Sequence, residues 1–305
     1  METLVSVVIP TYKRSDTLVR AIKSVLNQSY QRIEIIVVDD NEKDSLESKK
    51  VQEVLQKYNN RVTYINPEKH INGAVARNYG IKKANGDYIA FLDDDDYWLP
   101  TKIEKQVALI IEKQCALVYS NAKAEIVQGN NVTYMEYSLD YTKRGDMHEK
   151  IFMSICCLNI TILVEKQKLF EVGLFDEDVR FWQEYELTMR LAQVSLFYFV
   201  DEILAVYRVN VKDTGRLTNK YYEWRKAVDY IYDKHKKYYS QLSVFGKYYA
   251  RMTFVQDAIE RMRNAGLVFK RCIYLFLLNT AFIPLRLILK FKRNMAYQQY
   301  LLFRE

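Results

Sequence analysis

A chain of 305 residues can fold as one large unit, or as one unit with a helical appendage, because domains usually contain about 100–200 residues. Its composition of 49% apolar and 27% charged residues excludes extended disorder. The net charge of +7 is unevenly distributed, because residues 211–305 contain 19 Lys and Arg against 7 Asp and Glu, and residues 1–210 contain 26 against 31. A basic C-terminal part of this kind binds nucleic acid, binds an anionic membrane, or forms a solvated face.

The cysteines and the N-terminal segment both indicate a cytoplasmic protein. None of Cys115, Cys156, Cys157 and Cys272 has the two-residue spacing of a zinc or redox site, so we expect reduced side chains used in packing. The segment METLVSVVIPTYKR has no basic n-region and no small-residue cleavage site, and so does not resemble a signal peptide.

Residues 4–120 alternate short apolar runs with amphipathic stretches. The runs predict strands at 4–9, 33–38, 62–65, 87–92 and 116–120, and the stretches between them predict helices at 16–27, 46–58, 72–84 and 101–113. Val- and Ile-rich runs separated by helices are typical of a mostly parallel sheet with helices on both faces. The sequence therefore predicts an α/β fold whose ligands bind beyond the carboxyl ends of the strands.

The pattern changes after residue 120. Residues 124–137 predict a hairpin around Gly129, and residues 141–146 predict an exposed loop. Long helical patterns follow at 219–239, 244–264 and 267–292. We place the domain boundary near residue 210, between an α/β domain at 1–210 and a mainly α-helical C-terminal region at 211–305.

Four consecutive aspartates, Asp93 to Asp96, follow the fourth predicted strand. Carboxylates crowded at the end of a buried strand repel one another, and a divalent cation relieves the repulsion. Oxygen ligands suit Mg²⁺ or Mn²⁺, and a Mg²⁺ held by one or two carboxylates usually also binds substrate phosphates. The tetrad favours a metal and diphosphate site. The alternative is a solvated acidic turn before the helix at Thr101.

Four segments in series, SVVIPTYKR, IIVVDDNEKD, NGAVARNYG and GDYIAFLDDDDYWLP, resemble the nucleotide-binding half of family 2 glycosyltransferases. The resemblance extends to residue 210 and implies the Rossmann-like GT-A fold. It further implies that Asp39 accepts the N3–H of a pyrimidine and that Arg77 lies against the base or ribose. The residues that it assigns to the nucleoside pocket beside these two are Pro10, Thr11, Tyr12 and Arg14.

The Asp-x-Asp motif of that family corresponds to Asp93 and Asp95. By the resemblance, Asp93 bonds to the ribose side, Asp95 binds Mn²⁺ or Mg²⁺ on the diphosphate with Asp93 as a second metal ligand, and Asp94 contributes to nucleotide binding. Asp94 and Asp96 form an equally good pair. We favour the first register because the family's first aspartate directly follows the leucine of the strand end, here Leu92.

The segment FDEDVRFWQEYELTMRLA resembles the acceptor-side segment of the same family, and Glu184 occupies the position of its catalytic base, which is usually Asp. Alternatively, Glu184 is only a helix N-terminal acid that the helix dipole favours. Glu186 and Arg190 are four residues apart and predict an ion pair that orients the helix. The further candidates for diphosphate or acceptor contacts are Trp182, Gln183, Arg208 and Asn210, the last replacing a histidine found in many relatives.

The C-terminal region contains an apolar run at 272–285 that is bounded by Lys270, Arg271 and Arg286. It is shorter than the roughly 20 residues that cross a bilayer. The run predicts an interfacial helix on an anionic membrane. Alternatively, it packs on the catalytic domain or forms a homo-oligomer through the C-terminal helices.

The resemblance predicts an inverting glycosyltransferase that uses a UDP-sugar or dTDP-sugar. We expect its acceptor to be the hydroxyl of a glycan or lipid-linked molecule, in cell-surface polysaccharide synthesis at the inner face of the membrane. A sugar nucleotidyltransferase is the alternative enzyme, but it normally has a Gly-rich loop after the first strand, and TYKRSD contains no glycine. A non-catalytic membrane or nucleic-acid-binding protein is the third hypothesis. The retained acidic tetrad and Glu184 argue against it, and we expect no nucleic-acid partner.

Overall fold

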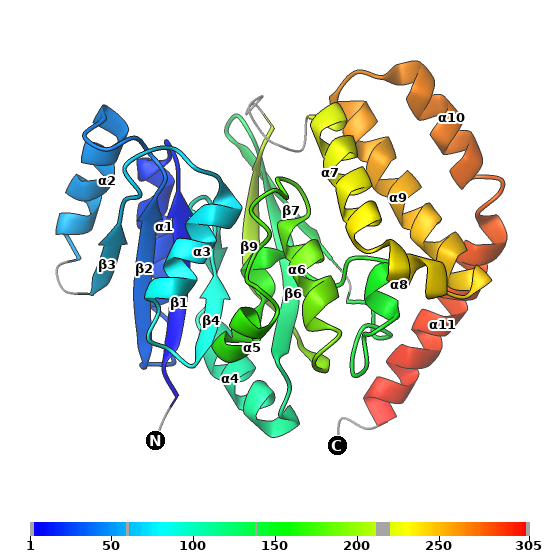
Figure 1. Cartoon of the computed structure of the whole chain (residues 1–305), viewed down its shortest axis with the longest axis horizontal. Coiled ribbons are helices and arrows are strands. Elements are labelled where there is room, and N and C mark those ends of the chain that lie inside the picture. The colour runs from blue at the N-terminus through cyan, green and yellow to red at the C-terminus, as the bar shows by residue number, and fades with distance from the viewer. Residues whose placement is uncertain (1–2, 59–60, 138, 212–219, 303–305) are drawn as a thin grey trace. The chain divides into compact units, whose positions relative to one another are not determined.

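The computed structural model describes residues 3–58, 61–137, 139–211 and 220–302 (Figure 1). The chain forms two compact units. The first contains Met1–Ser138 and Cys157–Lys212, and the second contains Leu139–Cys156 and Asp213–Glu305. Residues 139–156 therefore group with the C-terminal helices, whereas the sequence prediction assigned them to the domain at 1–210.

A nine-stranded sheet forms the centre of the first unit, with the order β3-β2-β1-β4-β8-β6-β9-β5 and with β7 paired to β6. The strands are β1 (Val5–Thr11), β2 (Ile33–Asp39), β3 (Val62–Ile65), β4 (Tyr88–Phe91), β5 (Tyr97–Trp98), β6 (Leu117–Gln128), β7 (Asn131–Glu136), β8 (Leu163–Glu165) and β9 (Phe197–Asn210).

Strands β3, β2, β1 and β4 run parallel, and Thr11 pairs with Asp39, so that β1 and β2 end at the same level. The rest of the sheet is mixed. Strand β8 is antiparallel to both β4 and β6, β9 is parallel to β6, and β5 is antiparallel to β9. The predicted α/β fold is confirmed, and all four parallel strands near the N-terminus were predicted.

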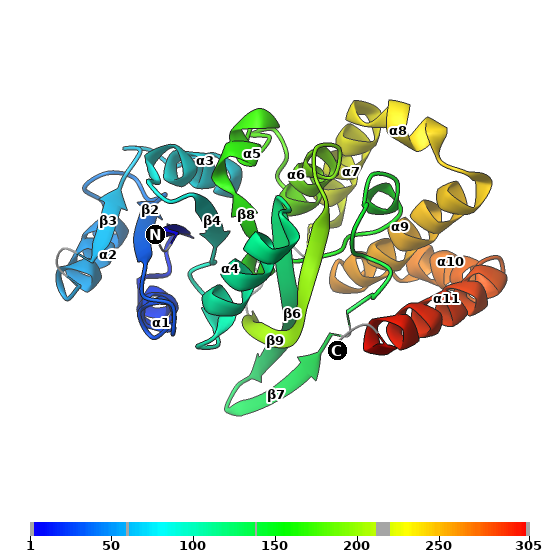
Figure 2. The same ribbon diagram turned by 90° about the horizontal axis from the view of Figure 1, so that it is seen from below.

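The first unit's helices cover both faces of the sheet, and Figure 2 shows α1 and α3 on opposite sides of β1 and β2. Val7 packs with Leu18 and Ile22 of α1, whereas Val8 points to α3. The approach at Gly80 is so close that a Cβ there would lie 2.3 Å from Val8 Cγ1. These helices are α1 (Ser15–Leu26), α2 (Leu46–Gln56), α3 (Gly73–Lys83), α4 (Lys102–Lys113), α5 (Lys166–Glu171) and α6 (Gln183–Leu191), with a 3-10 turn at Asn159–Thr161.

Strands β6 and β7 form the predicted hairpin. Gln128 pairs with Asn131, so the turn consists of Gly129 and Asn130. Gly129 has a φ of 62°, in the left-handed region that two-residue hairpin turns require and that glycine adopts without strain.

The second unit is helical. Its core joins Tyr249, Met252 and Leu285 with their neighbours, and Trp224 is fully buried. Residues 139–156 contact the helices of this unit: Asp140 accepts from Arg293 Nε at 2.8 Å, Met153 packs on the core, and Phe152 stacks on Tyr238. The helices are α7 (Tyr221–Lys234), α8 (Lys236–Gln241), α9 (Val244–Asn264), α10 (Val268–Leu278) and α11 (Ile283–Leu302), with a 3-10 turn at Lys150–Phe152.

The apolar run at 272–285 is divided between two helices, which corrects the prediction of one interfacial helix. Helix α10 ends at Leu278, and α11 begins at Ile283 with Pro284 in its first turn. Proline is accepted in the first turn but interrupts a helix interior. In the described part of the chain no single helix is long and apolar enough to cross a membrane, although α10 and α11, bent by 63°, pass that test as a pair.

Candidate active site

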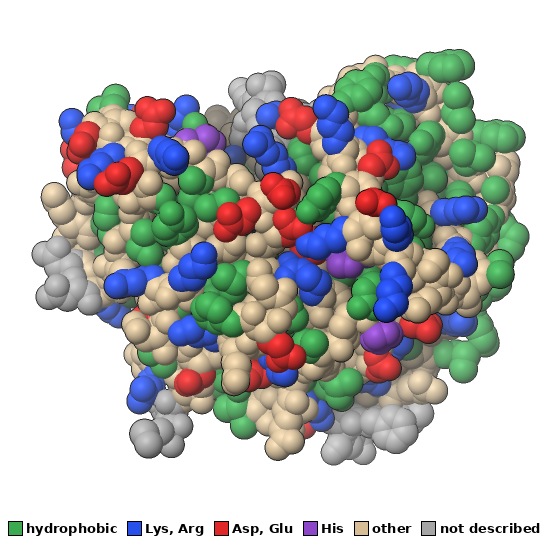
Figure 3. All heavy atoms as spheres, in the orientation of Figure 1, with side chains coloured by type: hydrophobic (Ala, Val, Ile, Leu, Met, Phe, Trp, Pro, Cys, Tyr) green, Lys and Arg blue, Asp and Glu red, His purple; other side chains and the backbone are tan. Residues whose placement is uncertain are grey.

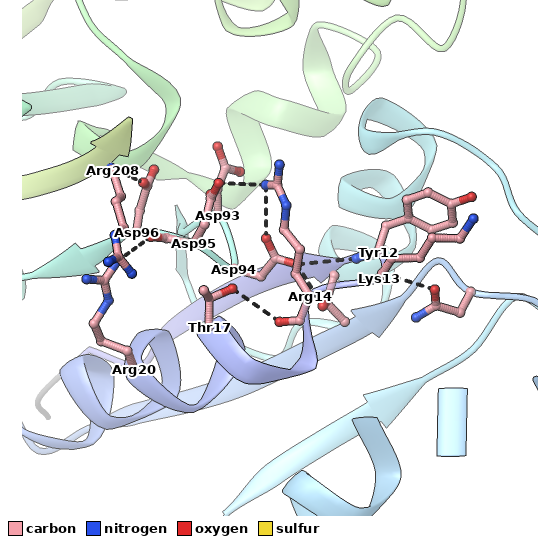
Figure 4. Close-up of polar contacts among 12 residues, drawn as sticks. Tyr12, Lys13, Arg14, Thr17, Arg20, Asp93, Asp94, Asp95, Asp96 and Arg208 are labelled. Carbon is pink, nitrogen blue, oxygen red and sulfur yellow. Dashed lines mark hydrogen bonds and ion pairs between the residues drawn. The ribbon is translucent and has the colours of Figure 1, made fainter. Parts of the chain in front are cut away.

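The carboxyl ends of β1, β2 and β4 bring the predicted donor-site residues to one edge of the first unit's sheet (Figure 4). Thr11 ends β1 and Asp39 ends β2. The tetrad follows β4, and Thr11 Oγ1 donates to Asp94 Oδ2 at 2.7 Å. The motifs at the ends of three strands are therefore neighbours in space.

The four aspartates alternate between exposed and buried positions. The side chains of Asp93 and Asp95 are 36% and 26% exposed, whereas Asp94 and Asp96 are buried. Asp94 also accepts from the Tyr12 amide at 3.3 Å, and Asp96 Oδ1 accepts from the Arg208 amide at 2.8 Å. The buried pair thus ties the tetrad to β1 and β9, and the other pair faces solvent.

The crowding of carboxylates changes the protonation of the buried pair. Burial raises the pKa of Asp94 to about 7, the charge of Asp95 adds to this shift, and Arg14 and the Thr11 hydroxyl oppose it. Burial and the neighbouring carboxylates likewise raise the pKa of Asp96 well above its ordinary value. The two buried carboxyl groups are therefore harder to ionise than exposed aspartates.

Two arginines compensate the exposed pair. Arg14 Nη1 lies 2.6 Å from Asp95 Oδ2, and Arg77 Nη2 lies 2.5 Å from Asp93 Oδ1. Arg77 Nη1 also donates to Gln183 Oε1 at 2.8 Å. Arg77 therefore connects the Asp-x-Asp segment to the first residue of α6, the helix that carries Glu184.

Asn159 contacts Arg77, and the sequence did not predict this contact. With its amide oriented to satisfy its neighbours, its oxygen accepts from Arg77 Nε at 2.6 Å and from Nη2 at 3.0 Å. Its backbone forms part of the 3-10 turn before β8. A single asparagine in a loop carries no sequence signal that would have identified it.

Asp39, predicted to bind the base, is fully buried and already accepts hydrogen bonds from the protein. Asn41 donates to Oδ1 from its amide nitrogen and its side chain at 3.1 and 2.7 Å, and the Tyr64 hydroxyl donates to Oδ2 at 2.8 Å. A carboxylate accepts about four hydrogen bonds. The three donors leave one acceptor position on Oδ2 unused by them, and the predicted bond to a base stays a prediction.

Next to Asp39, Tyr12 and His70 form an aromatic pair. Their ring centroids are 4.2 Å apart with 25° between the planes. His70 Nδ1 lies 3.1 Å from Asp40 Oδ2, and the Ile71 amide donates to Asp40 Oδ1 at 2.6 Å. Burial raises the pKa of Asp40, and these two contacts oppose that shift. His70 was not among the residues predicted for the site.

A charged cluster behind the tetrad also escaped the sequence analysis. Glu125, buried in β6, lies 3.1 Å from Arg20 Nη1 and 3.2 Å from Arg208 Nε and accepts from the Tyr97 hydroxyl at 3.1 Å. Arg20 Nη2 donates in turn to the Asp95 carbonyl oxygen. Arg20 therefore holds the tetrad backbone from α1, and the Arg208 amide holds the side chain of Asp96 from β9. Glu125 lies in a strand that also contains Ser120, Asn121 and Lys123, so the sequence did not single it out.

The acceptor-side segment starts α6. Trp182 precedes it with a φ of 58° and a ψ of 34°, a left-handed conformation that is uncommon for a non-glycine residue and occurs at functional sites. Glu184, the predicted base, is partly exposed in the first turn. The predicted pair of Glu186 and Arg190 is confirmed, because Arg190 Nη2 lies 2.6 Å from the fully buried Glu186.

The remaining predicted residues lie at the ends of strands. Pro10 pairs with Val38 in the parallel ladder, one residue before Thr11. Asn210 is exposed at the end of β9, two residues beyond Arg208. The predicted contact of Asn210 with the diphosphate or the acceptor stays a prediction.

The oxygen ligands at the tetrad fit a cation for which the protein supplies only some of the ligands. Within the described residues, no group of three or more His, Cys, Asp or Glu side chains is arranged to hold a metal ion. The exposed carboxylates of Asp93 and Asp95 supply hard oxygen ligands, and Mg²⁺ is commonly bound by one or two carboxylates together with substrate phosphates. These residues therefore fit a metal shared with a diphosphate and do not fit an all-protein cage.

Comparison with known proteins identifies the family. Residues 6–176 match the family described as Glycosyl transferase family 2. This chain belongs to glycosyltransferase family 2. An uncharacterized glycosyltransferase of Rickettsia typhi is 31% identical over 219 residues, 69% of this chain and 65% of that protein. Escherichia coli WfgD, a UDP-Glc:alpha-D-GlcNAc-diphosphoundecaprenol beta-1,3-glucosyltransferase, is 35% identical over 129 residues, 42% of this chain and 49% of WfgD. The chain therefore spans less than two thirds of the length of these relatives.

Solved structures agree with the fold. A crystal structure of S. aureus TarS in complex with UDP-GlcNAc superposes with a TM-score of 0.57 and 15% identity, over 86% of this chain and 89% of that one. At this identity the likeness concerns the fold alone. The family 2 glycosyltransferase is an enzyme of the GT-A fold, as predicted, and the nucleotidyltransferase alternative is not supported.

Proposed function

We propose that this glycosyltransferase moves a sugar from a UDP-sugar or dTDP-sugar onto the hydroxyl of a glycan or lipid-linked acceptor, with inversion at the anomeric carbon. The observation that carries the proposal is the bridge of Arg77, which bonds to Asp93 and to Gln183. It supports one site in which the donor side, at the tetrad, adjoins the acceptor side, at Glu184. Its biological role would be cell-surface polysaccharide synthesis at the cytoplasmic face of the membrane.

The names of similar proteins support the donor and acceptor classes. The TarS structure contains UDP-GlcNAc, and WfgD is named for a UDP-Glc donor and a diphosphoundecaprenol-linked acceptor. Asp39 retains an acceptor position on Oδ2, and uracil and thymine both present an N3–H. Tyr12 and His70 offer an aromatic surface beside it.

The residues of this chain divide the chemical work. Asp93 and Asp95 would hold Mn²⁺ or Mg²⁺, which supplies positive charge to the departing diphosphate. Arg14 and Arg77 pair with Asp95 and Asp93, and the backbone amide of Arg208 bonds to Asp96. Glu184, in the first turn of α6, would accept the proton of the attacking hydroxyl as general base.

Nucleotide titrations test the donor assignment. UDP and dTDP should bind in the presence of Mn²⁺ and lose affinity in EDTA, because the metal joins the diphosphate to the aspartates. CDP is the matched control, since cytosine has no N3–H, and it should bind more weakly. Transfer from a panel of UDP-sugars should then give products of inverted anomeric configuration by NMR. Equal binding of CDP, or retention of configuration, would refute the respective part of the proposal.

A further inference from the structure

The outer side of α10 is apolar and exposed. Its inner side, including Tyr274 and Leu278, packs against the core formed by α9 and α11. None of its residues is buried, and Phe269 and Phe276 are 80% and 68% exposed. Residues seven apart lie on one side of a helix, so the two phenylalanines share a face. Figure 3 shows hydrophobic side chains gathered over α10.

Helix α11 has the same two-sided character. Leu285 and Leu289 are buried in the core of the second unit, whereas Leu287 and Phe291 are 64% and 67% exposed. A helix on the surface of a globular protein normally has one apolar stripe toward the core and polar residues opposite. Contiguous exposed apolar patches mark interaction sites. We call the outer faces of the two helices the α10–α11 surface.

The charge around this surface has one sign. No Asp or Glu occurs in residues 261–304, whereas nine Lys and Arg do. Arg293 is paired with Asp140. Four exposed cations of the two helices have no carboxylate partner among the described residues. They are Lys270, Arg286, Lys290 and Lys292.

We propose that the α10–α11 surface docks on a membrane containing anionic lipids. A second copy of the chain is disfavoured as occupant, because a two-fold interface would bring the same cations together without any carboxylate between them. Anionic headgroups supply the missing negative charge, and the exposed phenylalanines enter the boundary between headgroups and acyl chains.

The surface lies on the bilayer and does not cross it. The inner faces of α10 and α11 pack against α9, so only their outer faces are available to lipid. The two helices pass the length and hydropathy test for a span only as a pair bent by 63°. This binding goes beyond the proposed transfer reaction and does not depend on it.

Flotation of the full-length protein with vesicles tests the proposal. It should float with vesicles of phosphatidylcholine and phosphatidylglycerol, float poorly with phosphatidylcholine alone, and lose binding as salt rises. Substitution of Phe269, Phe276 and Phe291 by Ser should abolish flotation. Val244→Ser, an equally exposed apolar residue of the same unit, should leave it unchanged.

Charge variants separate the electrostatic part. Lys290→Gln with Lys292→Gln should weaken binding to anionic vesicles by about five-fold per lysine, whereas Lys237→Gln with Lys247→Gln removes the same charge elsewhere on the unit and should have little effect. Circular dichroism and UDP binding show that each variant is folded.

A full-length protein that does not bind anionic vesicles and forms a dimer sensitive to the phenylalanine variants would overturn the proposal in favour of a second copy. Resistance to alkaline carbonate extraction would overturn it in favour of an inserted helix pair.

Discussion

Consecutive aspartates of one tetrad have opposite environments in this glycosyltransferase. The Thr11 hydroxyl and the Tyr12 amide donate hydrogen bonds to the buried Asp94. Asp93 and Asp95 face solvent beside arginines. Arg77 pairs with Asp93 and Arg14 pairs with Asp95, so a bound cation would compete with these arginines for the two carboxylates. The alternation supports the register in which the metal binds Asp93 and Asp95.

Substitution of single aspartates tests this register. Asp95→Asn should lower transfer by about 10²-fold or more and weaken metal-supported UDP binding, because it removes a charged oxygen ligand. Asp94→Asn keeps an oxygen for Thr11, so it should cost only about 0.5–1.5 kcal/mol of stability and leave most of the activity. Steady-state kinetics at several Mn²⁺ concentrations make the comparison. An inactive Asp94→Asn beside a nearly normal Asp95→Asn would reverse the register.

The role of Glu184 as general base predicts a separation of binding from chemistry. Glu184→Gln preserves shape but accepts no proton, so kcat should fall by about 10²–10⁴-fold while the Kd for UDP stays near wild type. Glu184→Asp should retain part of the activity. Glu177→Gln is a control with the same charge change at a carboxylate bonded to Asn78. Wild-type transfer by Glu184→Gln would assign the base elsewhere, with Glu186 and Asp96 as the next candidates.

Glu125 is predicted to matter through the two arginines it holds. Glu125→Gln would leave the guanidinium groups of Arg20 and Arg208, whose side chains are 32% and 34% exposed, beside a neutral partner, and should destabilise the fold by about 1–3 kcal/mol. Glu202→Gln breaks an exposed pair with Lys105 and should cost at most about 1 kcal/mol. Urea denaturation measures both. Equal losses would mean that the cluster contributes no more than a surface pair.

The site was predictable from the sequence where its residues follow strand ends in a fixed order. The tetrad was found this way, whereas Thr11 and Asp39 were assigned by the resemblance to the family. The parallel register puts the ends of β1 and β2 level. Arg20 and Glu125 were not found, since they are 105 residues apart and meet only through folding. The hydrogen bond from Tyr64 to Asp39 could not be predicted from the sequence either, because Tyr64 lies in a different strand.

At the level of elements, periodicity predicted the strands and helices up to residue 120 except the two-residue β5, and close packing explains details that periodicity could not give. The approach of α3 to β1 depends on Gly80, but a glycine inside a helical pattern indicates no particular neighbour. The end of α10 at Leu278 could not be predicted without knowing how residues 279–282 turn. Pro284 indicated only that the helical pattern is interrupted near this point. The grouping of residues 139–156 with the C-terminal helices depends on long-range contacts such as that of Asp140 with Arg293.

Packing of α3 on β1 gives a prediction with an unusual sign. Gly→Ala inside a helix normally stabilises by up to about 1 kcal/mol, but Gly80→Ala should destabilise by about 1–3 kcal/mol because its Cβ would overlap Val8. Val8→Ala removes the opposing methyl groups, so the double variant should lose less stability than the sum of the single variants. Denaturant titrations of all four proteins complete the cycle. Strict additivity would show that the two positions do not meet.

On the scale of the whole chain, the uneven charge of the sequence corresponds to the two units. Residues 211–305, with 19 basic and 7 acidic residues, provide most of the second unit, and the predicted acidic site lies entirely in the first. One cation of the second unit is not at the surface: Lys143 is buried, and its Nζ donates to the carbonyl oxygens of Lys150 and Ser154 at 2.8 and 3.3 Å. Burial of this ammonium couples the stability of the unit to pH.

Stability should therefore rise with pH in an alkaline window. Burial lowers the pKa of Lys143 from 10.5 to about 8, against the opposing effect of Cys156 and Asp140. Between pH 8 and 10.5 the unfolded chain carries the proton and the folded chain does not, so the free energy of unfolding increases with pH by at most about 1.4 kcal/mol per pH unit from this group. Lys143→Met removes the titration and should flatten the rise, whereas the exposed Lys237→Met should retain it. Chemical denaturation between these pH values measures the slope, and a rise of equal size in Lys143→Met would show that another group causes it.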